Sequence, residues 1–301
     1  MPDQYALVEG GPSFTPLRFG LLTAAELPAT LPREWTHGTM RVGRVCGPAS
    51  STAMIPCSGT PVTGEPTGDG VDVWAEDVFR VYGWEPCSPV GFGDDLVDLK
   101  RRAEQRLTDG EARAVERVFW TGHPTDGPAT TVYPHLASDT VVNGLSQGAV
   151  TPTKQMAATE VTSSAVTPAE AVGLLEGYLG ECYGGEGVIH VPRAALALLD
   201  NAYVVRREGE QLRTLAGNRV AAYSGGAYPG PDGSAPAAGT GWFYATGAVQ
   251  VKRGPIQDLG SQPGEIVGRL QNTTLYLVYR LYSVTFDCCL AAAEVTLEEA
   301  P

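Results

Sequence analysis

The segment Gly144–Gly148, with the sequence GLSQG, comes nearer to a catalytic motif than any other part of this chain. A Gly-x-Ser-x-Gly turn presents its serine as a nucleophile when a strand precedes it, a helix follows it, and an acid and then a histidine come later. Pro152 follows closely, and His190, the one downstream histidine, stands inside the apolar run Val188–Val191. The pattern therefore favours a glycine-flanked turn around Ser146, and a serine hydrolase is kept as an alternative.

Other residues with ligand or cofactor chemistry lack the required spacing. The four histidines are widely scattered: His37, His123, His135 and His190. The chain has no Cys-x-x-Cys, no His-Glu-x-x-His and no Gly-x-x-x-x-Gly-Lys pattern. Asp94 and Asp95 favour a helix start over a catalytic pair. We therefore expect no catalytic, cofactor-binding or metal-binding residues.

The cysteines are expected to be reduced. They are Cys46, Cys57, Cys87, Cys182, Cys288 and Cys289. The first residues lack a basic segment followed by an apolar run, which predicts no signal peptide and hence a reducing compartment. Adjacent residues of a strand point to opposite faces, so at most one of Cys288 and Cys289 should lie in the core. Intersubunit disulfides through the first three cysteines are the less favoured alternative.

Composition describes a globular protein and excludes two classes. The chain has 301 residues, 43% of them hydrophobic, and a net charge of −13. This balance gives no electrostatic footprint for nucleic-acid binding. No stretch approaches the roughly 18 apolar residues of a membrane span. Lysine is rare while alanine, glycine, proline and arginine are frequent, which suggests a high-GC genome.

Residues 1–120 are predicted to form an extended arm, a long loop and a long helix. Residues 1–45 are rich in proline and glycine, and residues 46–75 still more so, before a returning strand at Val71–Trp84. From Asp94 to Trp120, apolar residues recur at helical spacing. Gly110 leaves two helices open as an alternative to one helix of about 39 Å.

An α/β region follows the loop-rich residues 121–166. Thr167, Pro168 and Glu170 form a capping box that opens a helix ending near Gly184. A short strand, another helix from Pro192 and strands up to residue 251 come next. We expect the core of this region to contain Leu174, Leu175, Val188, Val191 and Leu196.

The last segment, Asn272–Leu297, is free of proline and glycine and rich in β-branched and aromatic residues. Its apolar residues lie first on one face and, from Tyr282 onward, on the other. A strand that exchanges its buried face needs a bulge or a strong twist. We therefore predict one long, bent terminal strand.

This order of parts resembles the major capsid protein of tailed bacteriophages, the Hong Kong 97 fold that bacterial encapsulin shells share. The likeness rests on the arm, the loop, the long helix, the segment GVIHVPRAALALL at 187–199 and the closing segment RLQNTTLYLVYRLYSVTFDCCLAAAEVTL at 269–297. It covers most of the chain, and none of these motifs is specific by itself. The resemblance implies an α+β fold with an N-arm, an E-loop, a spine helix, a peripheral (P) domain and an axial (A) domain.

Carried onto this chain, the resemblance implies five segments. They are the N-arm at 1–45, the E-loop at 46–93, the P domain with its spine helix at 94–166, the A domain at 167–241, and a return to the P domain with the long C-terminal strand at 242–301. In this family the N-arm and E-loop reach neighbouring subunits. We expect both to carry much of the assembly energy.

The implied function is structural and not enzymatic. The chain would assemble as hexamers and pentamers into the icosahedral head of a phage with a high-GC host, in the host cytoplasm, with scaffolding, cement and portal proteins as candidate partners. The head would enclose double-stranded DNA without sequence-specific binding and without a membrane. The alternatives are an encapsulin-type nanocompartment shell, another phage structural protein such as a tail component, and the serine hydrolase.

Covalent cross-linking of the shell is not expected. Some relatives join an E-loop lysine to an asparagine of a neighbouring subunit, but residues 46–93 contain no lysine. Lys100 falls on the presumed spine helix, where an ion-paired or solvated charge is the expected role. The resemblance therefore implies a shell held together without covalent bonds.

Overall fold

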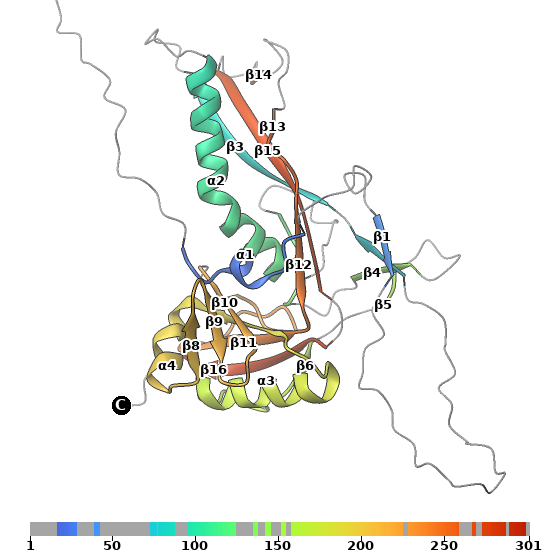
Figure 1. Ribbon diagram of the computed structural model, residues 1–301, viewed down its shortest axis with the longest axis vertical. Coiled ribbons are helices and arrows are strands. Elements are labelled where there is room, and N and C mark those ends of the chain that lie inside the picture. The colour runs from blue at the N-terminus through green and yellow to red at the C-terminus, as the bar shows by residue number, and fades with distance from the viewer. Residues whose placement is uncertain are drawn as a thin grey trace, which may run out of the picture.

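The computed structural model describes thirteen stretches of the chain, and the structural statements below concern these alone. They are residues 17–28, 39–42, 73–76, 78–87, 96–124, 135–137, 142–145, 152–154, 158–224, 228–258, 267–268, 273–286 and 289–298. Figure 1 shows a long helix standing on a sheet-and-helix body, with a small separate sheet to one side.

The long helix is α2, Leu96–Thr121, and it is continuous across Gly110. Thr108 donates its hydroxyl to the carbonyl of Glu104, as expected inside a helix and not at a second N-terminus. The single-helix interpretation is therefore confirmed, and Asp94 and Asp95 lie just outside the described residues. The buried side of the helix carries residues at helical spacing: Leu99, Ala103, Leu107, Val115 and Val118.

A ribbon of two long antiparallel strands runs along α2. These strands are β3, Phe79–Cys87, and β15, Thr273–Phe286. The other edge of β15 pairs with three shorter strands: β12 at Val249–Arg253, β13 at Gln257–Asp258 and β14 at Val267–Gly268. Alternate residues of the ribbon face α2, and Gly83 lets the helix backbone approach closely.

The second sheet has seven strands in the order β6-β16-β11-β7-β10-β9-β8. Their bounds are β6 Thr159–Glu160, β7 Val188–Pro192, β8 Val205–Glu208, β9 Gln211–Thr214, β10 Arg219–Tyr223, β11 Thr240–Thr246 and β16 Ala291–Thr296. β7 and β10 are parallel, while β11 runs antiparallel to both β7 and β16. All of β7 is buried, and its residues other than His190 are apolar.

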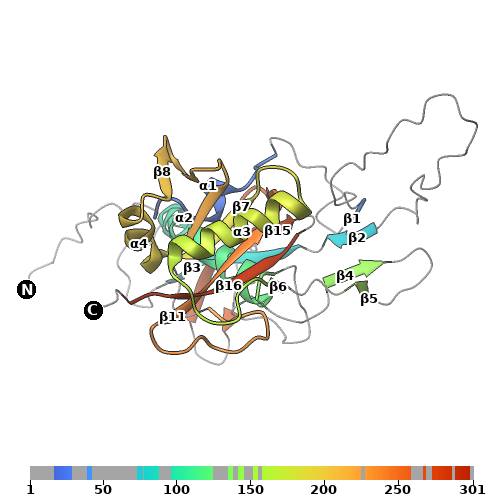
Figure 2. The same ribbon diagram turned by 90° about the horizontal axis from the view of Figure 1, so that it is seen from below.

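Helices cover both faces of this sheet. On one face lies α3, Pro168–Cys182, while α4, Leu196–Asn201, follows a 3₁₀ turn beside β8 (Figure 2). The opposite face meets the C-terminal end of α2 and the short α1, Leu21–Ala24. There Trp120 stacks on Tyr228 and meets the rings of Tyr223 and Tyr244 edge-on. These aromatic contacts join the long helix to the sheet.

Helix α3 begins as the capping box predicts, because the Thr167 hydroxyl accepts the backbone N–H of Glu170. The core predicted for this α/β region is only partly correct. Leu175 and Val191 are fully buried together, but Leu174 is 40% exposed and Leu196 is half-buried. Val188 is buried on the opposite face of the sheet, because β7 alternates sides along its length.

The prediction of one terminal strand is wrong. β15 belongs to the sheet along α2, whereas β16 belongs to the seven-stranded sheet. Between them Cys289 takes a left-handed backbone conformation, with φ of 59°. The predicted exchange of buried face at Tyr282 does not occur, because Tyr276, Val278, Tyr282, Val284 and Phe286 are all buried in one cluster on the same side of β15. The chain instead leaves this sheet after β15 and enters another layer.

The expectation of reduced thiols is wrong for one pair. Cys182, the last residue of α3, is bonded to Cys289, with the two Cα atoms 5.8 Å apart. The two residues are 107 positions apart in the chain, so no local signal foretold the pairing. Cys46, Cys57 and Cys288 lie outside the described residues.

The small separate sheet has the order β1-β2-β4-β5. Its strands are β1 Thr39–Val42, β2 Val73–Glu76, β4 Val142–Leu145 and β5 Pro152–Lys154. It brings together parts of the predicted N-arm, E-loop and P domain. The segment boundaries stay predictions. β16 lies after residue 242 but joins the same seven-stranded sheet as β7 and β10, with β11 between it and β7.

Replacing Gly83 by alanine is expected to lower the free energy of unfolding by about 1–3 kcal/mol. A Cβ at this position would overlap the carbonyl oxygen of Ala103 and lie 2.7 Å from the Cβ and backbone nitrogen of Leu107. The strand and the helix would therefore have to separate. Urea unfolding of the purified subunit measures the change.

Gly110→Ala is the matched control on α2, because a Cβ at Gly110 meets nothing within 4 Å. It should raise stability by about 0.5–1 kcal/mol through helix propensity. Equal effects of the two substitutions would contradict the close packing of β3 on α2.

Candidate assembly site

His190 does not serve a serine nucleophile in the part of the chain that the structure describes. Its Nδ1 lies 2.7 Å from the Tyr223 hydroxyl and its Nε2 lies 2.9 Å from the Thr246 hydroxyl, which itself donates to the carbonyl of Gly247. This direction makes Nε2 the protonated nitrogen and Nδ1 the acceptor of the tyrosine proton. Both ring nitrogens are therefore occupied inside the sheet.

Ser146 itself lies outside the described residues. β4 ends at Leu145, and the next described element is β5, which pairs antiparallel with β4 and is not a helix. The strand before the serine is thus present, but the hydrolase alternative gains no support from His190 or from the following element.

Burial lowers the pKa of His190 to about 3. Because the unfolded chain binds a proton below about pH 6.5 and the folded chain does not, stability is retained above that pH and falls as the pH drops below it. Between pH 7 and pH 5 we expect a loss of about 2 kcal/mol attributable to this residue. Denaturant unfolding at several pH values measures it.

His190→Gln is the matched variant, because glutamine can accept from Tyr223 and donate to Thr246 without titrating. Its loss of stability between pH 7 and pH 5 should be smaller than that of the unmodified chain. Parallel losses in the two proteins would show that His190 is not held neutral.

Residues 17–28 are bound to the body at several points. The Phe19 carbonyl accepts the N–H of Ala222 at 2.7 Å, and the guanidinium of Arg193 donates to the Arg18 carbonyl at 2.8 Å. Farther along, Glu26 exchanges backbone hydrogen bonds with Val249 and Val251 of β12. This described part of the predicted N-arm therefore spans from the seven-stranded sheet to the sheet along α2.

Glu116 of α2 anchors the same segment. One carboxylate oxygen accepts the N–H of Leu21 at 3.2 Å, and the other accepts the N–H and hydroxyl of Ser224. Burial raises the pKa of Glu116, and these hydrogen bonds partly oppose the rise. The carboxylate thus supplies an acceptor at the start of α1.

A buried ionic cluster joins α2 to the ribbon and to β12. Glu111 receives hydrogen bonds from Arg280 and from the Tyr282 hydroxyl, each at 2.6 Å, and from Arg253. Its side chain is 5% exposed and that of Arg280 is 11% exposed. Burial and the hydrogen bond to Glu111 raise the pKa of Tyr282 to about 12, so the tyrosine stays a donor. The cluster fixes the helix at its middle.

Ion pairs of lower burial tie the first half of α2 to the ribbon. Glu85 of β3 pairs with Arg102 at 3.4 Å and Arg106 at 3.0 Å. Lys100 lies 2.8 Å from Asp258 of β13, which confirms its predicted role as an ion-paired charge. Such pairs orient the elements more than they stabilise them.

The face of the ribbon that points away from α2 carries exposed aromatic residues. Tyr82 is 45% and Trp84 is 48% exposed, and they stand opposite Tyr279 and Leu277 of β15. Arg106 lies over the Trp84 ring at 5.4 Å. We name Tyr82, Trp84, Leu277 and Tyr279 the outer ribbon face. The sequence predicted a strand that includes Tyr82 and Trp84, but it did not indicate that these two side chains would be exposed.

Two solved capsid structures and one solved phage structure share this architecture over nearly the whole chain. The capsid of the native GTA particle matches with a TM-score of 0.53 at 15% identity, over 98% of this chain and 96% of that one. The capsid of Ralstonia phage GP4 matches with 0.51 at 10% identity, over 100% and 97%. Gordonia phage Cozz matches with 0.52 at 8% identity, over 99% and 92%.

The chain has the Hong Kong 97 capsid fold. The α+β class predicted for it is confirmed. No protein-family model and no curated protein sequence matches the chain. None of the helices in the described ranges is both long and apolar enough to cross a membrane. Within the Hong Kong 97 fold, the outer ribbon face is the candidate assembly surface, and residues 17–28 attach the predicted N-arm to its own subunit.

Proposed function

We propose that this chain is the major capsid protein of a tailed phage with a high-GC host, and that it assembles into an icosahedral head around the phage genome. The observation that carries the proposal is the likeness to capsid structures along both chains almost from end to end. A likeness of that extent concerns the whole subunit and not one module. We expect the virion as its location after assembly in the host cytoplasm.

The proposed shell repeats one subunit in hexamers and pentamers, so each contact surface recurs by symmetry. The outer ribbon face suits such a contact, because exposed tyrosine and tryptophan are enriched at interfaces. The E-loop and the rest of the N-arm, most of which lie outside the described residues, are the elements we expect to reach neighbours, whereas residues 17–28 attach the arm to its own subunit. Scaffolding, cement and portal proteins remain candidate partners.

Assembly is tested by expressing the full chain and measuring sedimentation and particle diameter by negative-stain microscopy. Closed shells of megadalton mass are expected. A stable monomer under all physiological conditions would overturn the proposal. Particles from infected cells that protect double-stranded DNA from nuclease would separate a phage head from an encapsulin-type compartment.

The shell should be held without isopeptide bonds. Residues 46–93 contain no lysine, and Lys100 is committed to Asp258. Particles boiled in detergent with reductant should therefore run as one band near 31.7 kDa. A ladder of multimers that survives reduction would contradict this expectation.

A further inference from the structure

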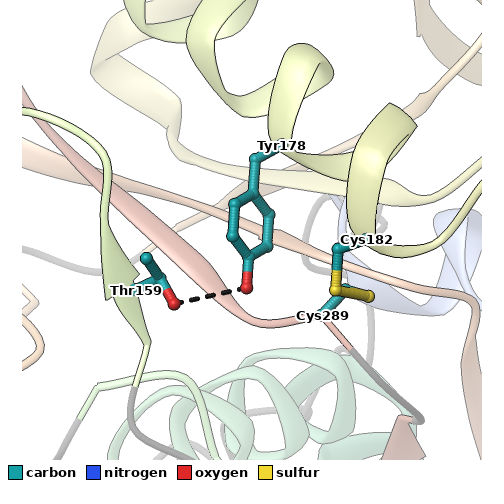
Figure 3. Close-up of a disulfide and its surroundings, with 4 residues drawn as sticks. All are labelled: Thr159, Tyr178, Cys182 and Cys289. Carbon is teal, nitrogen blue, oxygen red and sulfur yellow. Dashed lines mark hydrogen bonds between the residues drawn. A yellow bond between two sulfur atoms is a disulfide. The ribbon is translucent and has the colours of Figure 1, made fainter. Parts of the chain in front are cut away.

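The Cys182–Cys289 bond fastens α3 to the sheet that it covers. Figure 3 shows the bond at the end of the helix, with Tyr178 one turn earlier pointing toward Thr159 of β6. The hydroxyls of Tyr178 and Thr159 lie 3.2 Å apart. The helix is thus held at its C-terminal half by a hydrogen bond to β6 and by a covalent bond to Cys289, which lies just before β16.

The two sulfur positions differ in access. Cys289 is 7% exposed and packs in the core cluster between α3 and the sheet. Cys182 is half-buried and is followed closely by the exposed residues 184–186. A small oxidant or reductant can therefore reach the pair from the end of α3 without unfolding the sheet.

Neither cysteine needs the bond in order to pack. A free cysteine behaves as a small hydrophobic side chain, and the apolar neighbours of Cys289 suit that state. Neither residue lies on the outer ribbon face or in residues 17–28. The subunit can therefore fold and present its candidate assembly elements with both thiols reduced.

We propose that Cys182 and Cys289 form a late oxidation site, which is a dithiol while the shell assembles and becomes a disulfide after the particle leaves the host cell. The inference rests on the proposed function, because assembly in a cytoplasm exposes the thiols to a reducing pool. On oxidation the two thiols release two protons and two electrons, and one sulfur–sulfur bond forms. Dioxygen accepts the electrons and becomes hydrogen peroxide, or a small disulfide accepts them and becomes two thiols.

The bond acts on the stability of the released particle. It closes a loop across 107 positions of sequence, and a cross-link over so long a loop restricts the unfolded chain strongly. It also holds Cys289 in its left-handed conformation at the break between β15 and β16. The oxidised subunit should therefore resist heat better than the reduced one, with the same assembled shape.

The test follows the thiols through release. Particles are taken from cells lysed directly into an alkylating reagent, and others are alkylated only after exposure to air. Peptide mass spectrometry then determines whether Cys182 is alkylated or disulfide-bonded in each sample. We expect Cys182 to be alkylated in the first sample and bonded to Cys289 in the second. The unfolding temperature of aged particles should fall by roughly 5–15 °C on reduction.

Variants identify the partner and control for side effects of reductant. Cys289→Ser should leave Cys182 alkylated after air exposure and abolish the effect of reductant on the unfolding temperature. Cys288→Ser changes the neighbouring cysteine and should leave both results unchanged. If Cys289→Ser does not fold, reduction of the unmodified particle still gives the comparison.

Three results would overturn the proposal: a bond already present in the quenched cytoplasmic sample, a free Cys182 in aged particles, or a pairing that is lost in Cys288→Ser and retained in Cys289→Ser. Failure of the proposed function can be distinguished from these results, because no particles would then be seen in micrographs. The mass measurement on the unassembled subunit would then still show whether Cys182 and Cys289 are reduced in the cell and bonded after exposure to air.

Discussion

Replacing Glu111 by alanine is expected to lower the free energy of unfolding by about 3–5 kcal/mol, because it leaves a buried cation without its partner. Arg280 is nearly buried, and its Nε has no hydrogen-bond partner among the described residues, so the carboxylate of Glu111 is its main compensation. The Tyr282 hydroxyl would lose its acceptor as well. Urea unfolding of the subunit measures the loss, which should also reduce the yield of shells.

Asp258→Ala is the matched control, because it also removes a carboxylate that pairs with a basic residue between α2 and a neighbouring strand. It breaks the pair with Lys100, whose side chain is 43% exposed, and should cost much less than Glu111→Ala, because solvent screens an exposed pair. Glu111→Gln should fall between the two, since it keeps hydrogen-bonding atoms but loses the charge. Equal costs for Glu111→Ala and Asp258→Ala would show that the cluster is not desolvated as described.

Leu175→Ala is expected to lower the free energy of unfolding by about 2–5 kcal/mol. The side chain is fully buried between α3 and the sheet, where it packs with Val191 and Phe243. Its removal leaves a cavity that a strand fixed on both edges can close only in part. Thermal or urea unfolding of the isolated subunit gives the value.

Leu174→Ala provides the comparison from the adjacent position on the same helix. Because Leu174 is 40% exposed, its truncation should cost less than about 1 kcal/mol. A larger cost for Leu174 than for Leu175 in the isolated subunit would mean that the helix face is misassigned. A strong effect of Leu174→Ala on shell formation alone would instead place this exposed leucine in a subunit contact.

The two buried carboxylates of α2, Glu111 and Glu116, hold different parts of the subunit. Glu111 holds the middle of the helix against the ribbon, and Glu116 holds residues 17–28 against its C-terminal half. The helix is therefore the element through which the N-terminal segment, the ribbon and the seven-stranded sheet are connected. Substitution of either carboxylate should therefore change the relative position of these parts, and with it the yield of shells, as well as the free energy of unfolding.

Local sequence patterns indicated the two longer helices, α2 and α3, and the start of α3. The spacing of Leu99, Ala103 and Leu107 is a property of adjacent turns, and the Thr167–Glu170 capping box acts within four residues, so neither depends on distant parts of the chain. The order of arm, loop, long helix and closing strands was likewise readable, and it led to the fold class that the capsid structures confirm.

Contacts between distant segments were decided by the tertiary structure alone. No local pattern marked Glu111 or Glu116 as buried, and Leu174 was predicted to lie in the core although it is 40% exposed once α3 packs on the sheet. The final segment had the composition of one strand, but which sheet each half joins depends on the partners β3 and β11. Cys182 and Cys289 come together only because the chain leaves β15 and enters the seven-stranded sheet, which α3 covers. The physical reason is that burial and long-range pairing are properties of the assembled layers, whereas a sequence window records only what neighbouring residues favour.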